Sequence, residues 1–152
     1  MRKVLLLGVV ALALASCETT NQNLYDWGSA RSNSNSNDGT LYEQSFYRYY
    51  DLQAPENLCN LLCAYDEIIN NPGGARNVPP PGICAEYGYL LLSPGTAETF
   101  SSNATEWQKE RFNTADFTTQ FRELGLLMFQ KEMEFYPESA TFIKPILERL
   151  KK

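Results

Sequence analysis

The sequence predicts a single all-α domain of about five helices over residues 40–152. Apolar side chains recur three and four positions apart in five segments, which is the spacing that places them on one face of a helix. Proline, glycine and helix-capping residues stand between these segments. No segment of any length alternates apolar and polar residues with the period of two that predicts a strand.

The first two predicted helices have clear starts. Thr40 and Glu43 have the Thr-x-x-Glu spacing of a capping box, which predicts a helix over about residues 40–51. Pro55 suits the first turn of a second helix, because an N–H at that position would have no partner within the helix. This second helix is the clearest amphipathic segment, and its apolar stripe consists of Leu58, Leu61, Leu62, Tyr65, Ile68 and Ile69. The sequence Asn-Asn-Pro-Gly-Gly at residues 70–74 ends it.

Three further helices are predicted over residues 82–92, 115–136 and 140–150. Each carries an apolar face, and proline or glycine stands at its boundary. Pro145 must lie in the first turn of the last helix or kink it. The stretch 96–114 is ambiguous, although Asn103 could start a short helix that carries Trp107 and Phe112.

Residues 1–16 have the three parts of a secretory signal peptide, with a basic start, an apolar run of about a dozen residues and small residues before the cleavage point. The apolar run is shorter than the roughly 20 residues that a membrane-spanning helix needs. The sequence Leu14-Ala15-Ser16-Cys17 resembles the lipobox of bacterial lipoproteins, in which the cysteine receives a diacylglycerol before cleavage. The alternative is an ordinary secreted protein with a cysteine near its cleavage site.

An acylated Cys17 would hold the mature chain at a membrane, because two or more lipid chains anchor a protein stably. Residues 17–39 then comprise the lipidated cysteine, a tether and a loop rich in serine and asparagine. Glu18 is not the aspartate that tends to retain lipoproteins at the inner membrane of enteric bacteria. We therefore expect a lipid-anchored protein of the bacterial cell envelope, and the sequence favours the outer membrane over the inner membrane.

The composition excludes several classes of function. Once Arg2 and Lys3 leave with the signal peptide, 11 basic side chains face 18 acidic ones, so the net charge is −7. A negative surface argues against nucleic acid and against electrostatic docking on anionic lipid. The chain has no histidine, which excludes Ser-His-Asp catalysis and removes the commonest zinc ligand. We therefore predict that the protein is not an enzyme and that it holds no metal or cofactor.

The remaining reactive residue types have structural interpretations. Asp66 with Glu67, and Glu132 with Glu134, are the carboxylates that could act as acid and base, but their helical spacing favours a solvated face. Three cysteines remain in the mature domain: Cys59, Cys63 and Cys84. We interpret them as small buried residues, and a disulfide between the third and either of the first two stays open.

Two of the predicted helices resemble the halves of a tetratricopeptide repeat, which pairs two helices. The matching positions are Cys84, Tyr87, Gly88, Leu91 and Gly95 in the first half, and Gly125, Phe129 and Pro137 in the second. Gly88 and Gly125 would let the two backbones approach closely, and Phe129 would fill the seam. Glu132 departs from the repeat, which has alanine there, and about 25 residues separate the two halves. The alternative is an ordinary α-helical bundle.

Several segments, in their order along the chain, resemble a family of small bacterial lipoproteins with a tetratricopeptide-like domain. They are the lipobox and residues 24–28, 41–50, 79–82, 86–90 and 135–140. Relative to that family, residues 32–38 and 96–120 look inserted. Members are often encoded beside a curli-transport-type lipoprotein, which implies a partner of that kind, and no catalytic residue is known for the family.

We therefore expect a non-enzymatic adaptor or assembly factor in a cell-envelope complex, with other envelope lipoproteins as partners. The candidate partner-binding residues are Tyr42, Tyr49, Tyr87 and Tyr89. Each of these tyrosines could equally be a core residue. The alternative function is a small-ligand-binding or lipid-binding envelope lipoprotein, in which the aromatic helices enclose a pocket.

Overall fold

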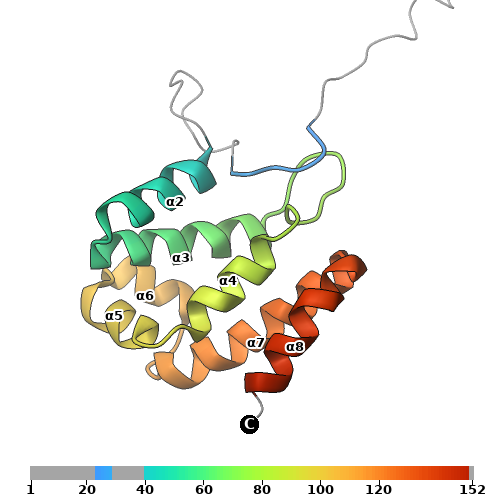
Figure 1. The fold of residues 1–152 in the computed structure, drawn as a ribbon. Helices are drawn as coiled ribbons and strands as arrows, with labels where there is room; N and C mark the ends of the chain where they lie inside the picture. Colours follow the sequence, from blue (N-terminus) through green and yellow to red (C-terminus); the bar gives the residue numbers. More distant parts are fainter. Residues whose placement is uncertain (1–22, 29–39, 151–152) are drawn as a thin grey trace, which may run out of the picture.

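The computed structural model describes residues 23–28 and 40–150. These residues contain helices and no strand, which confirms the predicted all-α class (Figure 1). The elements are α2 (Leu41–Leu52), α3 (Pro55–Asn70), α4 (Ile83–Leu92), α5 (Thr96–Asn103), α6 (Glu106–Phe112), α7 (Phe117–Phe135), the 3-10 helix η2 (Pro137–Ser139) and α8 (Ala140–Leu150). The predicted signal peptide and lipobox, with Leu14, Ala15, Ser16 and Cys17, lie outside the described residues.

The described chain forms seven α-helices rather than about five, because the ambiguous stretch 96–114 contains both α5 and α6. The other five lie within two residues of their predicted bounds. Gly95 precedes α5 with φ at 81°, a left-handed conformation that glycine adopts without steric cost. Thr105 precedes α6 and forms a complete capping box with Gln108, so each side chain accepts a hydrogen bond from the other residue's backbone N–H.

α3 is the central helix of the domain and contacts α2, α4, α5 and α6 (Figure 1). Nine of its 16 residues are buried. Its apolar surface is wider than the predicted stripe, because Cys59, Cys63 and Ala64 are also buried. A helix that is buried on more than one side can organise several neighbours around it, and α3 does so here.

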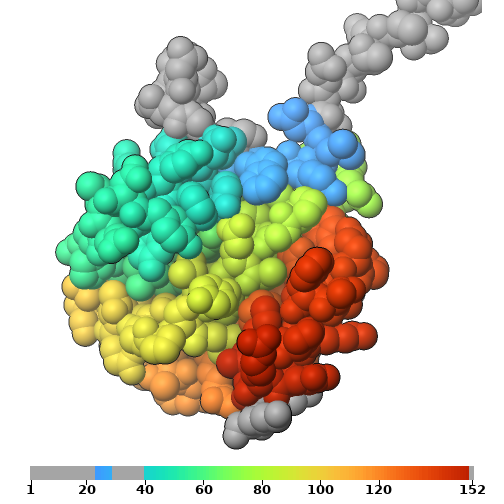
Figure 2. Space-filling view, viewed as in Figure 1, coloured from blue at the N-terminus to red at the C-terminus, as the bar shows by residue number. Residues whose placement is uncertain are grey.

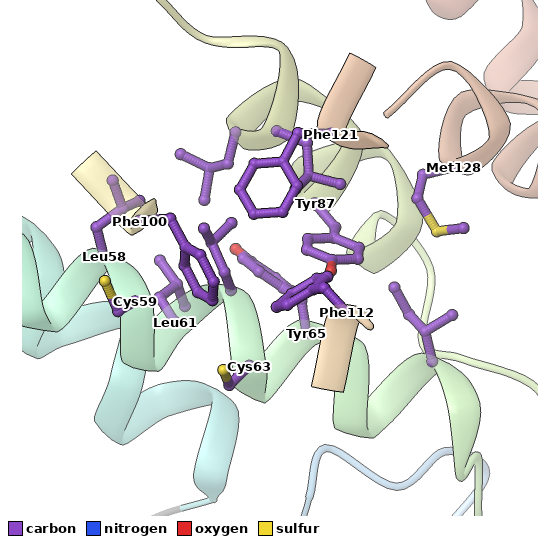
Figure 3. Close-up of a cluster of buried hydrophobic side chains, with 14 of the residues drawn as sticks. Leu58, Cys59, Leu61, Cys63, Tyr65, Tyr87, Phe100, Phe112, Phe121 and Met128 are labelled. Carbon is purple, nitrogen blue, oxygen red and sulfur yellow. The ribbon is translucent and has the colours of Figure 1, made fainter. Parts of the chain in front are cut away.

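Four phenylalanines join α5, α6 and α7 in the core: Phe100, Phe112, Phe117 and Phe121. Their ring centroids lie 5.0–6.5 Å apart in edge-to-face arrangements, which aromatic pairs prefer. Figure 3 shows Phe100, Phe112 and Phe121 in the same cluster as Leu61 of α3. Residues 96–120 therefore supply part of the core.

α4 and α7 make the most extensive contact between described helices, and two glycines lie at its centre. A Cβ built on Gly88 would lie 2.8 Å from the carbonyl oxygen of Gly125, and one built on Gly125 would lie 3.0 Å from the carbonyl oxygen of Gly88. Any larger residue would force the helices apart. The predicted close approach of the two backbones is confirmed, while the tetratricopeptide-like arrangement as a whole stays a prediction.

Glu132 holds the start of α4. Its side chain is 2% exposed, and its carboxylate accepts hydrogen bonds from the backbone N–H groups of Gly82 at 2.8 Å and Ala85 at 3.3 Å. Gly82 precedes α4 and has no side chain that could cap the helix itself. Burial raises the pKa of Glu132, and hydrogen bonds from the backbone of Gly82, Ala85 and Cys84 oppose that rise. The tetratricopeptide repeat has alanine at this position, and the hydrogen bonds of Glu132 to the start of α4 explain why glutamate stands here instead.

Residues 23–28 lie along the connector between α3 and α4 (Figure 2). The backbone N–H groups of Ala75 and Arg76 donate to the carbonyl oxygens of Asn23 and Leu24, at 2.9 Å and 3.0 Å. Gly74 approaches this segment so closely that a Cβ there would lie 2.7 Å from the carbonyl oxygen of Leu24. The aromatic segment 23–28 is therefore part of the folded domain.

We expect Glu132→Ala to lower the free energy of unfolding by about 2–3 kcal/mol, because the N–H groups of Gly82 and Ala85 lose a charged acceptor in a partly buried place. Urea denaturation followed by circular dichroism measures this change. Glu134→Ala is the matched control, since Glu134 is exposed two positions along the same helix. Equal losses of stability in the two variants would contradict the capping role of Glu132.

Candidate functional site

An aromatic surface extends over α2 and α4. We call it the tyrosine face and define it by Tyr42, Phe46, Tyr50, Glu86 and Tyr89. Tyr50 is 50% exposed and Tyr89 is 64% exposed. The ring of Phe46 lies 4.5 Å from that of Tyr50 and 5.4 Å from that of Tyr42. Burial raises the pKa of Tyr50, and so do Tyr49, Glu86 and Tyr89. The hydrogen bond from Tyr42 to Glu86 joins α2 to α4 at this surface.

Glu86 connects three helices at the tyrosine face. Its Oε2 atom accepts hydrogen bonds from the hydroxyl of Tyr42 on α2 at 2.9 Å and from that of Tyr65 on α3 at 2.8 Å. Burial raises the pKa of both tyrosines, and Glu86 raises it further, so both phenols stay protonated and act as donors. Charge-assisted hydrogen bonds of this kind hold side chains in one geometry. Tyr42 and Glu86 of the tyrosine face are therefore held in one arrangement before any partner binds.

The four predicted partner-binding tyrosines fall into two groups. Tyr42 and Tyr89 belong to the tyrosine face, and Tyr49 is half-buried at its border. Tyr87 is 1% exposed, and its ring stacks on Tyr65 with centroids 5.6 Å apart inside the core (Figure 3). For Tyr87 the core interpretation is the correct one, and we exclude it from the candidate surface.

A cleft of about 510 Å³ opens between α2, α3 and α6, and we call it the α2–α6 cleft. Its lining consists of Leu41, Gln44, Ser45, Arg48, Asn57, Asn60, Cys63, Ala64, Glu67, Trp107, Gln108 and Arg111. Eight of these twelve residues have polar or charged side chains. The volume lies within the range of about 300–1,000 Å³ that small-molecule sites occupy. From α2, the cleft is lined by Leu41, Gln44, Ser45 and Arg48, whereas Tyr42, Phe46 and Tyr50 belong to the tyrosine face. The two surfaces therefore occupy different faces of α2.

Ion pairs attach α6 to α3 at this cleft. The Arg111 guanidinium donates to Asp66 at 2.8 Å and to Glu67 at 3.0 Å, and its carbon lies 5.4 Å from the centroid of the Trp107 ring. Burial lowers the pKa of Arg111, but hydrogen bonds to the two carboxylates raise it more. The carboxylate pair at residues 66 and 67 therefore has a structural partner, and it does not form the predicted solvated face.

The amide groups of the cleft are held in place by hydrogen bonds. Gln108 is 6% exposed, and its Nε2 donates to the Oδ1 of Asn60 at 2.8 Å while its Oε1 accepts from the backbone N–H of Thr105. The Nδ2 of Asn57 donates to the carbonyl oxygen of Arg48 at 3.3 Å. The walls of the cleft thus present oriented donors and acceptors before any ligand arrives.

Sequence reasoning missed the cleft and three members of the tyrosine face: Phe46, Tyr50 and Glu86. The cleft depends on α6, which begins in the ambiguous stretch, and the Thr-x-x-Gln capping box at Thr105 was the signal that could have located it. Tyr50 stands four residues after Phe46, which is the spacing that places it on the same helix face. No sequence signal pairs Glu86 with Tyr42, because the contact spans 44 residues.

The three cysteines are free and buried, which confirms their interpretation as small buried residues. Burial raises the pKa of Cys59 to about 11, and it raises the pKa of Cys63 and Cys84 to about 12. Among residues 23–28 and 40–150, no group of three or more histidine, cysteine, aspartate or glutamate side chains could hold a metal ion. In the same part of the chain, no helix is both long enough and apolar enough to span a membrane.

We expect Cys59, Cys63 and Cys84 to resist thiol reagents at pH 8 while the protein is folded. At that pH a thiol with a pKa near 11 is about one part in a thousand thiolate, and only the thiolate reacts. Labelling with a maleimide, counted by mass spectrometry in the Cys17→Ala variant, measures this protection. Three labels in denaturant and none in buffer is the expected result, and rapid labelling of folded protein would contradict it.

Comparisons with protein-family models, with curated proteins and with solved structures find no match for this chain. Its function is therefore argued from the tyrosine face, the α2–α6 cleft and the predicted lipid anchor.

Proposed function

We propose that this protein is a membrane-anchored bacterial lipoprotein that acts as a non-enzymatic adaptor or assembly factor in a cell-envelope complex, with a curli-transport-type lipoprotein as its partner. The observation that carries the proposal is the tyrosine face. Tyrosine is enriched at protein interfaces, because its ring buries a large apolar area while its hydroxyl still makes a hydrogen bond. Tyr50 and Tyr89 offer such rings to a partner at 50% and 64% exposure.

The rigidity of this surface favours binding. The hydroxyls of Tyr42 and Tyr65 are already bound to Glu86, at 2.9 Å and 2.8 Å. A partner that docks beside Tyr50 and Tyr89 would thus meet Tyr42 and Glu86 already held in place. Binding to a preformed surface costs less conformational entropy than binding to mobile side chains.

The predicted anchor supports the same role. Asn23 is hydrogen-bonded to the connector between α3 and α4, and the six residue steps that separate it from Cys17 span at most about 20 Å when extended. The tyrosine face begins close by, because the backbone N–H of Tyr42 donates to the carbonyl oxygen of Trp27 at 3.2 Å. An acylated Cys17 would thus keep this surface near other membrane-bound proteins and raise their effective concentration.

The partners of the carboxylates support binding rather than catalysis. Asp66 and Glu67 bind Arg111, and Glu132 binds the backbone at the start of α4. A carboxylate that is already hydrogen-bonded in this way is a poor general base, and the chain has no histidine to take its place.

Small-ligand binding is a second candidate function, and the α2–α6 cleft is the observation that favours it. The cleft has a ligand-sized volume of about 510 Å³. Its lining combines an apolar surface with amide and charged side chains, which suits a ligand that has both apolar and hydrogen-bonding parts.

We expect Cys17→Ala to move the protein from the membrane fraction to the soluble fraction, because the acyl chains have no other attachment point in the proposed lipobox. Fractionation of cells followed by immunoblotting measures the change. Recovery of the partner after crosslinking should fall in the same variant, since co-localisation on a membrane is lost. A Cys17→Ala protein that stays in the membrane fraction would contradict the anchor.

We expect Tyr89→Ala to reduce crosslinked recovery of the curli-transport-type lipoprotein by about tenfold, the loss typical of removing an aromatic side chain from the centre of an interface. Quantitative mass spectrometry of crosslinked native membranes measures it. Trp107→Ala is the matched control, because Trp107 is 61% exposed and Tyr89 is 64% exposed, yet the two lie on different surfaces. Equal recovery from the two variants would contradict the role of the tyrosine face.

A further inference from the structure

Trp107 is a large aromatic residue that the core does not use. It is 61% exposed, and one side of its ring faces the guanidinium of Arg111 at 5.4 Å from the ring centroid. It lines the α2–α6 cleft together with a group of amide side chains. An exposed indole beside oriented amides offers two kinds of contact at once, an apolar plane and hydrogen-bonding groups.

The amides suit a ligand with many hydroxyl groups. Each asparagine or glutamine side chain both donates and accepts, as each hydroxyl does. Asn57 and Asn60 lie three residues apart on α3 and therefore share a helix face. The Oδ1 of Asn60 accepts a hydrogen bond from the Nε2 of Gln108. No described residue accepts a hydrogen bond from the Nδ2 of Asn60. That donor is available to a ligand in a fixed orientation.

The charges of the cleft indicate that the ligand is neutral. Arg48 and Arg111 are its basic residues, while Glu67 lines it and Asp66 binds Arg111 directly. These two positive and two negative charges cancel. An anionic ligand such as a phosphate would compete with carboxylates that already hold Arg111 at 2.8 Å and 3.0 Å.

We propose that the α2–α6 cleft is a binding site for a neutral saccharide of about disaccharide size. The sugar ring stacks its C–H face on Trp107, and its hydroxyls bond Asn57 and Asn60. The cleft volume of about 510 Å³ accommodates two sugar rings and retains water at the edges. This inference rests on the second candidate function, small-ligand binding, and does not depend on the adaptor role.

The test uses the full-length lipidated protein, labelled with ¹⁵N, in a zwitterionic detergent that has no sugar headgroup. The chain has two tryptophans, so its spectrum contains two indole N–H signals, and Trp107→Ala identifies one of them. The probes are maltose, cellobiose and N,N′-diacetylchitobiose, with glucose 6-phosphate and n-octanol for comparison. We expect at least one disaccharide to shift the Trp107 signal in a saturable manner and to leave that of Trp27 in place.

Variants then assign the contacts. Trp107→Ala should weaken binding of that disaccharide by about tenfold, which corresponds to the loss of one aromatic stacking contact. Because this variant lacks the Trp107 indole signal, its binding is followed by the backbone amide signals of the cleft. Asn60→Ala should weaken it as well, and Tyr89→Ala should not change it, since Tyr89 lies outside the cleft. Circular dichroism melting of each variant checks that it is folded.

Four outcomes would overturn the proposal: no shift with any of the three disaccharides, unchanged binding in Trp107→Ala, tighter binding of glucose 6-phosphate than of the neutral sugars, or saturable binding of n-octanol at the Trp107 signal instead. None of these outcomes tests the adaptor role, because that role is tested by the crosslinked recovery of the partner from the Tyr89→Ala variant. The two proposals therefore fail separately.

Discussion

The contact between α4 and α7 determines where the side chains of the candidate surfaces lie. Gly88 and Gly125 bring the two backbones together in the middle of α4, and Glu132 holds its first turn. A helix fixed at its start and at its centre cannot rotate about its axis. Tyr87 therefore enters the core, Tyr89 faces solvent, and Glu86 stands where it can bind hydroxyls from α2 and α3.

α2 lies over α3 and separates two surfaces of opposite chemistry. On one side aromatic rings gather around the carboxylate of Glu86, and on the other side amides and an ion-paired arginine line the α2–α6 cleft. The surfaces share no residue. A single helix can serve both because its residues point in all directions around its axis, with about 100° between neighbours. Binding a partner and binding a small ligand are thus compatible in one small domain.

Periodicity predicted the five longer helices, because it depends on residues close together in sequence. The glycine contact was predicted from the resemblance of two helices to the halves of a tetratricopeptide repeat. Periodicity did not resolve α5 and α6, which have 8 and 7 residues and too few apolar positions to show a period. Tyr87 and Tyr89 lie two residues apart and therefore on different sides of α4, so the helical spacing indicates that they point apart. The structure shows which of them is buried, because Tyr87 stacks on Tyr65 of α3 and Tyr89 is exposed. The cleft joins three separate segments and has no local signature.

If Cys17 carries the proposed lipid anchor, the attachment of residues 23–28 has a mechanical consequence. A pull along the tether would reach the hydrogen bonds from Ala75 and Arg76 to Asn23 and Leu24 before it reached α2. The force would thus act first on the connector between α3 and α4, next to the central helix α3. Movement of the membrane or of an attached neighbour would therefore move the domain as a whole and would not first detach α2 from it.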